Sequence, residues 1–283
     1  MYAALFVLVP GRAAYGPRTP GGQRHRYKLN GLSAWMLTLV LAMYAVYLKI
    51  ISPSCIAEHW DSFIVAASSW CFLLVGVFQV KAHFFPDTAG DTLVTGYFFF
   101  DVFNGGELHP RWPGSFDWKH FNASRSGGLL LWTLIDLSFA AHQYERHGMI
   151  TNSMVLTVAY RAIIVAEYFY FEHWFFETLD STNERFSFYS IYGFAAVMPH
   201  IWTLQSQYLA QNPKVLSPTG LCLSIGLFAM GWALNHLTNR QKVRVKKTLG
   251  ECTIWGRTPK LLRATYKTSD GKIHQTKLLC SGE

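Results

Sequence analysis

The chain has 283 residues, of which 51% are hydrophobic, 16% are aromatic and only 15% are charged. This balance is too apolar for an ordinary soluble domain of the same size, so part of the surrounding solvent must be lipid. A bilayer core about 30 Å thick requires about 20 apolar helical residues to cross it. The composition therefore predicts an all-α polytopic membrane protein.

Six segments of the chain approach the length that a membrane-crossing helix needs. Three are long and uncharged, and three are shorter or interrupted by charged side chains. We therefore expect about six transmembrane helices, with residues 1–9 too short to cross alone. In chain order, the segments are residues 32–48, 63–80, 128–141, 149–171, 186–209 and 219–237.

The formal net charge is +8, and the positive side chains gather at two places. Residues 240–277 contain eleven Lys or Arg against two acidic residues, and five more basic residues precede the first expected span. Under the positive-inside rule both ends of the chain face the cytoplasm, which an even number of spans permits. Orientation in a membrane is a sufficient reason for these basic segments, so we expect no nucleic-acid partner.

These patterns divide the chain into three regions. Residues 1–28 form a partial N-terminal span and a basic arm, residues 29–239 form the transmembrane body, and residues 240–283 form a cytoplasmic basic segment. Within the last region, residues 261–268 are followed by the Ser-Asp-Gly sequence of residues 269–271, which is typical of a turn. This pattern predicts a small cytoplasmic β-hairpin near the C-terminus.

Four ionisable side chains, Asp136, Arg161, Glu167 and Glu172, interrupt the apolar segments. A charge inside a bilayer is costly, so each is a functional candidate unless it pairs with a neighbour. Asp136 either faces a site or bonds to a neighbouring helix, and Arg161 either neutralises an acidic residue or extends toward the interface. Glu167 and Glu172 lie about 140° apart around a helix. We therefore expect only one of the two, with Glu172 preferred, to face a site.

The sequence predicts no metal site. His142, Glu145 and His147 are spaced one residue too widely for the His-x-x-Glu-His zinc motif, and no third ligand lies nearby in the sequence. The chain also lacks a Gly-x-Gly-x-x-Gly turn, so a dinucleotide cannot be held in the Rossmann manner. Residues 242–247 provide the positive charge that a phosphate-rich cofactor requires. The same charge would equally serve anionic lipid.

Residues 96–111, with the sequence GYFFFDVFNGGELHPR, resemble a signature of the membrane sterol reductases. His109 stands where that family usually has Asn. Residues 116–127 and 199–209 resemble later segments of the same family, and Glu172 stands at one of its acidic positions. The similarity extends over almost the whole chain.

Within the family, residues 252–279 resemble an insert of the branch that acts on the 7,8 double bond. The resemblance implies an NADPH-dependent reduction of the 7,8 double bond of 5,7-diene sterols in the endoplasmic reticulum membrane. It implies a sterol substrate, membrane lipid and other enzymes of sterol biosynthesis as partners. Two alternatives stay open: a reductase of another ring double bond such as delta-14, and a sterol-binding or scaffold protein that lacks catalysis.

The resemblance also indicates cofactor residues. Lys242 and Lys246 align with two basic positions that meet the cofactor phosphates, and Leu279 aligns with an apolar cofactor contact. The family usually has Arg at the second position, and Lys lacks its two-pronged fork, so we expect a weaker grip. The family continues beyond Glu283, so residues 240–283 hold only the start of its cofactor-binding region.

The resemblance implies a chain truncated at both ends, with the proton donor in the missing C-terminal part. We therefore expect this stretch alone to bind NADPH poorly and to show no turnover. Within the chain, Glu107, Asp136 and Glu172 are the candidates for the proton donor. Glu107 follows a Gly-Gly pair in a segment that we interpret as a pocket wall.

Overall fold

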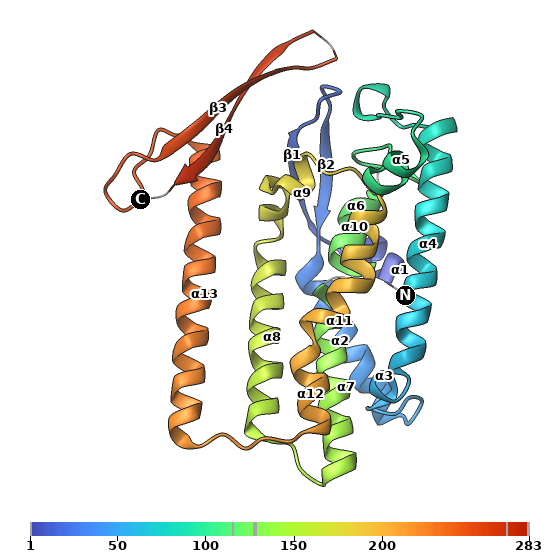
Figure 1. Ribbon diagram of the computed structural model, residues 1–283, viewed down its shortest axis with the longest axis vertical. Coiled ribbons are helices and arrows are strands. Elements are labelled where there is room, and N and C mark those ends of the chain that lie inside the picture. Colours follow the sequence, from blue (N-terminus) through green and yellow to red (C-terminus); the bar gives the residue numbers. More distant parts are fainter. Residues whose placement is uncertain (1, 115, 127–128, 270, 282–283) are drawn as a thin grey trace.

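The computed structural model describes residues 2–114, 116–126, 129–269 and 271–281 (Figure 1). Most of the described chain is helical, with two separate two-stranded antiparallel sheets. The segments and regions predicted from the sequence include six residues that lie outside the described ranges, namely Met1, Gly127, Gly128, Asp270, Gly282 and Glu283.

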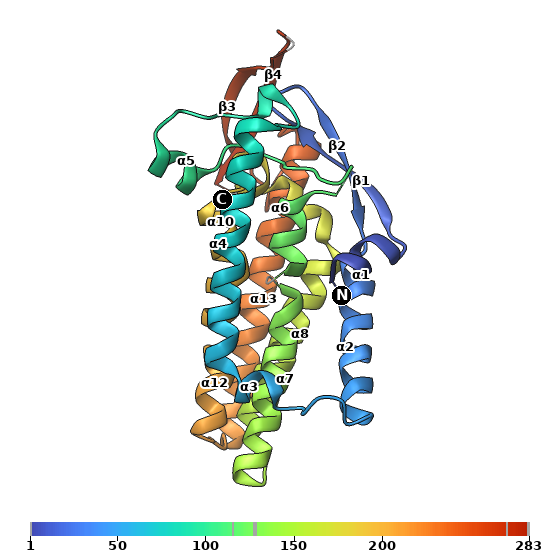
Figure 2. The same cartoon turned by 90° about the vertical axis from the view of Figure 1, so that its right-hand side faces the viewer.

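Long helices run side by side and in alternating directions along the long axis of the molecule (Figures 1 and 2). They are α2 (Gly31–Tyr47), α4 (Trp60–Phe84), α7 (Leu129–His147), α8 (Asn152–Tyr170) and α13 (Pro218–Lys247). α2 leads away from the end that carries the sheets, α4 returns to it, α7 leads away and α8 returns. α13 returns last, after an interrupted helical path.

The interrupted path corresponds to the expected segment 186–209. It consists of α10 (Phe188–Tyr192), a π-helical turn (η4, Gly193–Val197), α11 (Met198–Trp202) and α12 (Leu204–Gln211). A proline within the first turn of α11 lacks an N–H group, so it cannot support a regular helical ladder through this region. The sequence therefore predicted the helical character of this segment but not its interruptions.

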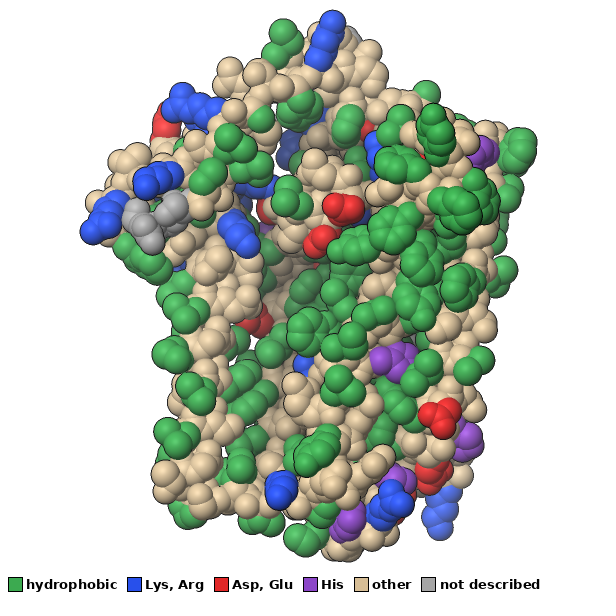
Figure 3. Space-filling model, in the orientation of Figure 1, with side chains coloured by type: hydrophobic (Ala, Val, Ile, Leu, Met, Phe, Trp, Pro, Cys, Tyr) green, Lys and Arg blue, Asp and Glu red, His purple; other side chains and the backbone are tan. Residues whose placement is uncertain are grey.

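Three helices of the described residues are long and apolar enough to cross a membrane: α4, α8 and α13. α2 is apolar but has only 17 residues. α7 has 19 residues, but Asp136, Glu145 and Arg146 make it more polar. The six expected spans are thus not confirmed. Hydrophobic side chains nonetheless cover much of the visible flank of the bundle (Figure 3).

The hairpin expected near the C-terminus is present. It pairs β3 (Lys260–Lys267) with β4 (Ile273–Ser281) in an antiparallel sheet. It extends from the end of α13 across the end of the molecule (Figure 1). At its tip, the N–H and the hydroxyl of Ser269 donate to the Pro20 carbonyl at 3.0 and 3.2 Å, so the tip contacts the first hairpin.

A second hairpin, β1 (Arg12–Arg18) paired with β2 (Arg24–Leu29), was not predicted. The expectation of an all-α chain whose only sheet lies near the C-terminus is therefore wrong for the basic arm. Along β2, basic side chains alternate with His25, Tyr27 and Leu29, and Tyr27 is buried. This period-two alternation is the strand signal that the charge of the arm concealed.

Short helical elements connect the long ones. They are α1 (Tyr2–Leu8), α3 (Cys55–Glu58), η1 (Ala89–Asp91), α5 (Phe98–Asn104), α6 (Trp118–Phe121), η2 (Asn122–Ser126), η3 (Glu172–Glu177) and α9 (Leu179–Thr182). Figure 2 shows α5 near the end that carries the hairpins, α1 near the middle of the long axis and α3 toward the opposite end.

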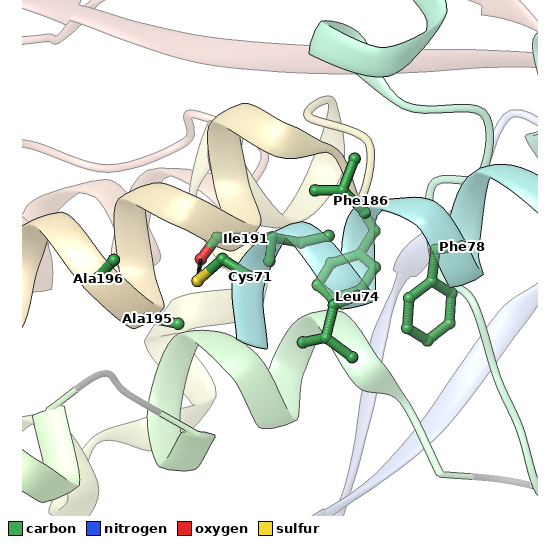
Figure 4. Packing of buried hydrophobic residues seen from close by; sticks show 8 residues of the cluster. Cys71, Leu74, Phe78, Phe186, Ile191, Ala195 and Ala196 are labelled. Carbon is green, nitrogen blue, oxygen red and sulfur yellow. Dashed lines mark hydrogen bonds between the residues drawn. The ribbon is translucent and has the colours of Figure 1, made fainter. Parts of the chain in front are cut away.

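One hydrophobic core joins α4 to the interrupted path (Figure 4). Leu74 and Phe78 of α4 pack with Phe186 and Ile191, while small alanines on the first turns of the path let α4 approach closely. The Cys71 thiol donates to the Ile191 carbonyl at 3.8 Å. α13 differs from α4 in its packing, because no residue of its apolar, membrane-crossing stretch is buried.

Candidate functional site

A buried polar cluster lies where β2 meets α2, near the ends of α6 and α8. Arg125 is fully buried, and its Nη1 donates to Glu172 Oε1. Its Nη2 donates to Asn30 Oδ1 at 3.0 Å. Glu172 Oε2 accepts the Gly31 N–H at 3.0 Å. His120 Nε2 lies 3.0 Å from Glu172 Oε1. We call Asn30, His120, Arg125 and Glu172 the Glu172 cluster.

Local backbone places each member of this cluster at a helix end or an irregular turn. Asn30 precedes α2 directly, and its side-chain amide donates to the carbonyls of Phe6 and Val9 at 3.0 and 2.8 Å. Arg125 lies in the π turn η2, with its guanidinium 5.1 Å from the Phe6 ring and 5.6 Å from the Phe169 ring. These contacts hold the arginine between aromatic faces, which suits a planar cation.

The charges of the Glu172 cluster are compensated by each other. Burial raises the pKa of Glu172, but the Arg125 guanidinium and His120 outweigh it, and the net pKa is lowered to about 2. Glu172 therefore stays ionised at neutral pH and is a poor proton donor. His120 is 1% exposed, and its Nδ1 has no hydrogen-bond partner among the described residues.

A second buried cluster adjoins the first through α6. Asp117 caps α6 by accepting the His120 N–H at 2.8 Å, and its other oxygen lies 3.3 Å from His109 Nδ1 and 3.5 Å from Arg111 Nη2. The Tyr27 hydroxyl lies 3.3 Å from His109 Nδ1. We call Tyr27, His109, Arg111 and Asp117 the Asp117 cluster.

The environment of the Asp117 cluster also shifts its pKa values. Burial opposes ionisation of Asp117, but His109 and Arg111 together hold the pKa of its carboxyl far below the usual range. Burial raises the pKa of Tyr27, so the phenol stays protonated and can donate a hydrogen bond.

Lys119 is a further buried group on α6. It is 4% exposed, and Nζ donates to the carbonyls of Ser181, at 2.9 Å, and Glu184. Burial lowers the pKa of Lys119 to about 7, although nearby acidic groups, Asp117 foremost, oppose the shift. This lysine therefore ties α6 to α9 and to the loop that follows it.

Each cluster borders a cavity. The larger cavity, of about 990 Å³, lies between α1, the first hairpin and the loop before α6, and Tyr27 and Asp117 contribute to its wall. The smaller one, of about 520 Å³, lies between the starts of β1 and α2 and the end of α8, and Asn30 and Glu172 line it. Both cavities combine a polar group at the wall with hydrophobic side chains.

Asp136 faces its neighbouring helices. Its carboxylate lies 3.1 Å from Arg161 Nε of α8 and accepts the Ser206 hydroxyl of α12 at 2.6 Å. Of the two alternatives expected for Asp136, the structure shows the bond to a neighbouring helix. Of the two expected for Arg161, it shows neutralisation of an acidic residue. Glu167 lies apart and contacts His236 Nδ1 of α13 at 2.6 Å.

Glu107 lies at the end of α4. Both of its carboxylate oxygens accept hydrogen bonds from Lys81 Nζ at 2.9 Å, and Oε1 also accepts the Asp87 N–H at 2.8 Å. All three candidates for the proton donor, Glu107, Asp136 and Glu172, thus pair with a basic side chain. The structure does not bring them together.

The expected cofactor residues lie around the end of α13. Lys242 is exposed, and Lys246 donates to the Glu177 carbonyl at 2.7 Å and lies 3.2 Å from its carboxylate. Leu279 of β4 is partly buried opposite Leu261 of β3. Neither lysine lines either of the two cavities described above.

No group of three or more His, Cys, Asp or Glu side chains within the described ranges could hold a metal ion. Sequence reasoning missed Asn30, His120, Arg125 and Asp117 as members of a buried centre. Three of these stand within residues 116–127, where polar residues occur between two apolar segments. That interruption was the available signal.

The sequence matches the ergosterol biosynthesis ERG4/ERG24 family over residues 1–282. It is 38% identical over 268 residues to a 7-dehydrocholesterol reductase of Xenopus laevis, which covers 94% of this chain and 56% of the relative. It is 30% identical over 283 residues to a 7-dehydrocholesterol reductase of Arabidopsis thaliana, covering 99% of this chain and 64% of the relative.

A delta(14)-sterol reductase of Methylotuvimicrobium alcaliphilum is 30% identical over 282 residues, which cover 99% of this chain and 62% of the relative. The chain thus spans less than two thirds of the length of these curated relatives. Because the family match includes nearly every residue, including both buried clusters, the chain belongs to the ERG4/ERG24 family of sterol reductases.

Proposed function

We propose that this chain serves the NADPH-dependent reduction of the 7,8 double bond of 5,7-diene sterols, a step of sterol biosynthesis. The observation that carries the proposal is the 38% identity to the Xenopus laevis relative named 7-dehydrocholesterol reductase, whereas the Arabidopsis relative of that name and the bacterial delta(14)-sterol reductase are both 30% identical. Reduction of the delta-14 bond is the alternative within the family.

The interior of the molecule supports a sterol as the substrate. A sterol is a flat, apolar polycycle with a single hydroxyl, so it requires apolar walls and one or two polar groups that fix its orientation. The lining of the larger cavity is mostly apolar but includes Tyr27, Asp117 and three basic side chains, and the lining of the smaller one includes Arg12, Asn30 and Glu172 beside apolar groups. We infer that a sterol hydroxyl or ring edge meets one of these polar groups.

Reduction of an alkene adds a hydride to one carbon and a proton to the other, and positive charge develops on the ring between the two events. NADPH supplies the hydride when it is bound. Fixed negative charge in a site that excludes water stabilises such a cation more than water does. Glu172 is held ionised by Arg125, so it does not suit the role of the acid, and its negative charge is already compensated within its cluster.

The end of α13 supports a phosphate-bearing cofactor. Lys242 is exposed and has no ion-pair or hydrogen-bond partner in the described part of the chain, so its charge is available. Lys246 lies on the same face one turn later but is shared with Glu177. We propose that Lys242 and Lys246 contact the phosphates of NADPH and that Leu279 contacts an apolar part of it.

The distribution of charge supports a multi-pass protein with both ends of the chain on one side of the membrane. The basic hairpin within residues 1–28 and the basic segment 240–283 lie at the same end of the helices (Figure 1). Under the positive-inside rule this end is cytoplasmic. We propose the endoplasmic reticulum as the membrane, with residues 29–239 as the embedded body.

The test uses a chimera in liposomes with 7-dehydrocholesterol and NADPH: because the chain spans only 56% of the Xenopus laevis relative, it replaces the matching part of that protein. Loss of the conjugated diene together with NADPH oxidation is the expected result, and a sterol with an 8,14-diene serves as the competing substrate. Lys242→Ala should raise the KM for NADPH about 10-fold or more, because it removes a charge-assisted phosphate contact. Lys214→Ala, which removes a charge from the opposite end of the molecule, is the matched control.

A sterol-binding or scaffold protein of the same family is the second candidate, because Glu107, Asp136 and Glu172, the candidates for the proton donor, each pair with a basic side chain. Saturable sterol binding without NADPH oxidation would favour this candidate. Preferential reduction of the 8,14-diene would replace the proposed substrate with the delta-14 one. Absence of both binding and reduction would overturn the proposal.

A further inference from the structure

The short helix α5 exposes an unusual number of aromatic side chains. Tyr97, Phe98 and Phe99 at its start are 77%, 71% and 84% exposed, and Phe100 and Phe103 are about half exposed. Side chains of this size are normally buried, and a contiguous exposed group of them marks an interaction surface. We call these five residues the aromatic patch.

Charged groups are absent from the exposed surface of this segment. Asp101 is the sole acidic or basic side chain between residues 93 and 104, all of which are described, and it is buried. Its carboxylate accepts the Thr95 N–H at 3.0 Å, the Thr95 hydroxyl at 2.7 Å and the Gly96 N–H at 2.9 Å. Gly96 has a φ of 85°, which glycine adopts without strain. Asp101 thus fixes the turn that directs the aromatic patch outward.

The aromatic patch continues the apolar surface of a helix that can cross a membrane. α4 is such a helix, and Phe84 and Phe85 at its end are 72% and 74% exposed. The Gln79 amide of α4 donates to the Asp101 carbonyl, and Val102 packs on the core that contains Phe78. α5 therefore lies at the depth where the apolar part of α4 ends.

The figures agree with this placement. Figure 2 shows α5 projecting sideways from the bundle beside the end of α4. Figure 3 shows hydrophobic side chains gathered over that corner of the molecule. A helix that projects sideways at the end of a membrane span is positioned to lie in the plane of the bilayer surface.

We propose that α5 is an interfacial helix that inserts Tyr97, Phe98 and Phe99 into the boundary between lipid headgroups and acyl chains. Aromatic side chains favour this boundary, and an apolar face lying along it adds membrane binding in proportion to the area buried. No exposed charge lies between residues 93 and 104, and the exposed His83 and Asp87 lie beyond the apolar part of α4, which is the order of apolar and charged groups expected across a membrane surface. The occupant is therefore the bilayer that α4 enters.

The test places one nitroxide label at Phe99→Cys in the full chain, with its five cysteines replaced by alanine. Two reference labels calibrate it: Val77→Cys, on the exposed face of α4, reports lipid, and Trp255→Cys, after α13, reports water. In liposomes, the ratio of collisions with oxygen to collisions with a water-soluble nickel chelate measures depth. We expect the ratio at 99 to exceed that at 255 at least threefold and to approach that at 77.

A ratio at 99 equal to the one at 255 would show an exposed, aqueous patch and would overturn the proposal. Low collision rates with both reagents would show a patch covered by protein and would overturn it as well. A second measurement avoids the cysteine replacements. The fluorescence that Phe99→Trp adds to that of the ten original tryptophans should be quenched by phospholipids brominated on the acyl chain, whereas the fluorescence that Tyr15→Trp on β1 adds should not be quenched.

Discussion

The molecule contains two buried pairs of a carboxylate and an arginine, Glu172–Arg125 and Asp136–Arg161, and the two pairs connect different kinds of structure. Glu172–Arg125 joins the start of η3 to the π turn η2, and through Asn30 and Gly31 it also holds the junction of β2 and α2. Asp136–Arg161 joins two regular helices, α7 and α8. The first pair shapes irregular backbone beside a cavity, whereas the second fixes helix packing.

The two pairs also differ in how completely they are enclosed. Both side chains of the first pair are about 1% exposed. Arg161 is 10% exposed, and it also donates to Gln205 Oε1 at 3.0 Å and to the Trp202 carbonyl. Arg125 keeps Asn30 Oδ1 and the Ser124 hydroxyl as acceptors, but without the carboxylate its charge has almost no contact with solvent, whereas Arg161 keeps some. The difference leads to an ordered series of predictions.

Glu172→Gln should have the largest effect. The variant keeps the shape of the side chain but leaves the Arg125 charge buried without its counterion, which should cost about 3–5 kcal/mol of unfolding free energy. Chemical unfolding in detergent micelles, followed by tryptophan fluorescence, measures this loss. The double variant Arg125→Met with Glu172→Leu should recover much of it. A single variant as stable as the original chain would contradict the prediction.

The stability from Glu172 should disappear in acid. Its folded pKa of about 2 lies below the ordinary value of about 4.3, so its contribution is complete above that value and is lost as the pH falls toward 2. The difference in unfolding free energy between the original chain and Glu172→Gln should therefore shrink between about pH 5 and pH 2. A difference that stays constant over this range would refute the assigned pairing.

Asp136→Asn should have an intermediate effect. Arg161 keeps two other acceptors and some contact with its surroundings, so we expect a loss of about 1–3 kcal/mol. The same unfolding measurement applies. If Asp136→Asn destabilised the chain more than Glu172→Gln does, the proposed difference between the pairs would be wrong.

Gly90→Ala should have the smallest global effect because it acts on an uncharged contact. A Cβ at this position would clash with the Ser269 hydroxyl and lie 2.7 Å from the Gly21 Cα, so the tip of the β3–β4 hairpin should separate from the first hairpin. We expect faster proteolysis within β3 and β4 and a change in unfolding free energy below about 1 kcal/mol. Gly226→Ala, which meets no atom within 4 Å, is the control, and equal proteolysis of both variants would disprove the contact.

Sequence reasoning succeeded for features that depend on neighbouring residues. Hydropathy identified each long helix, because an apolar segment of this length is rarely found in any other element of secondary structure. The turn sequence after residue 268 identified the β3–β4 hairpin. The β1–β2 hairpin was not predicted. The five basic residues of the arm are explained equally well by orientation in a membrane, and three of them occupy the polar positions of the alternation along β2.

Part of the candidate site was also within reach of the sequence. The cost of charge in apolar segments selected Glu172 and Asp136, and both are buried. Their partners were not predictable, because Arg125 and Glu172 are 47 residues apart and Asp136 and Arg161 are 25 apart. Whether the carboxylates donate protons and whether Lys242 and Lys246 bind the cofactor stay predictions.

The sequence by itself determined the apolar character of the chain, the position of its long helices and its family, because these depend on composition and on the order of residues. The tertiary structure alone decided which charges neutralise each other, where the cavities lie and which aromatic side chains stay exposed. These properties arise from distances between segments remote in the chain, and local pattern carries no information about such distances.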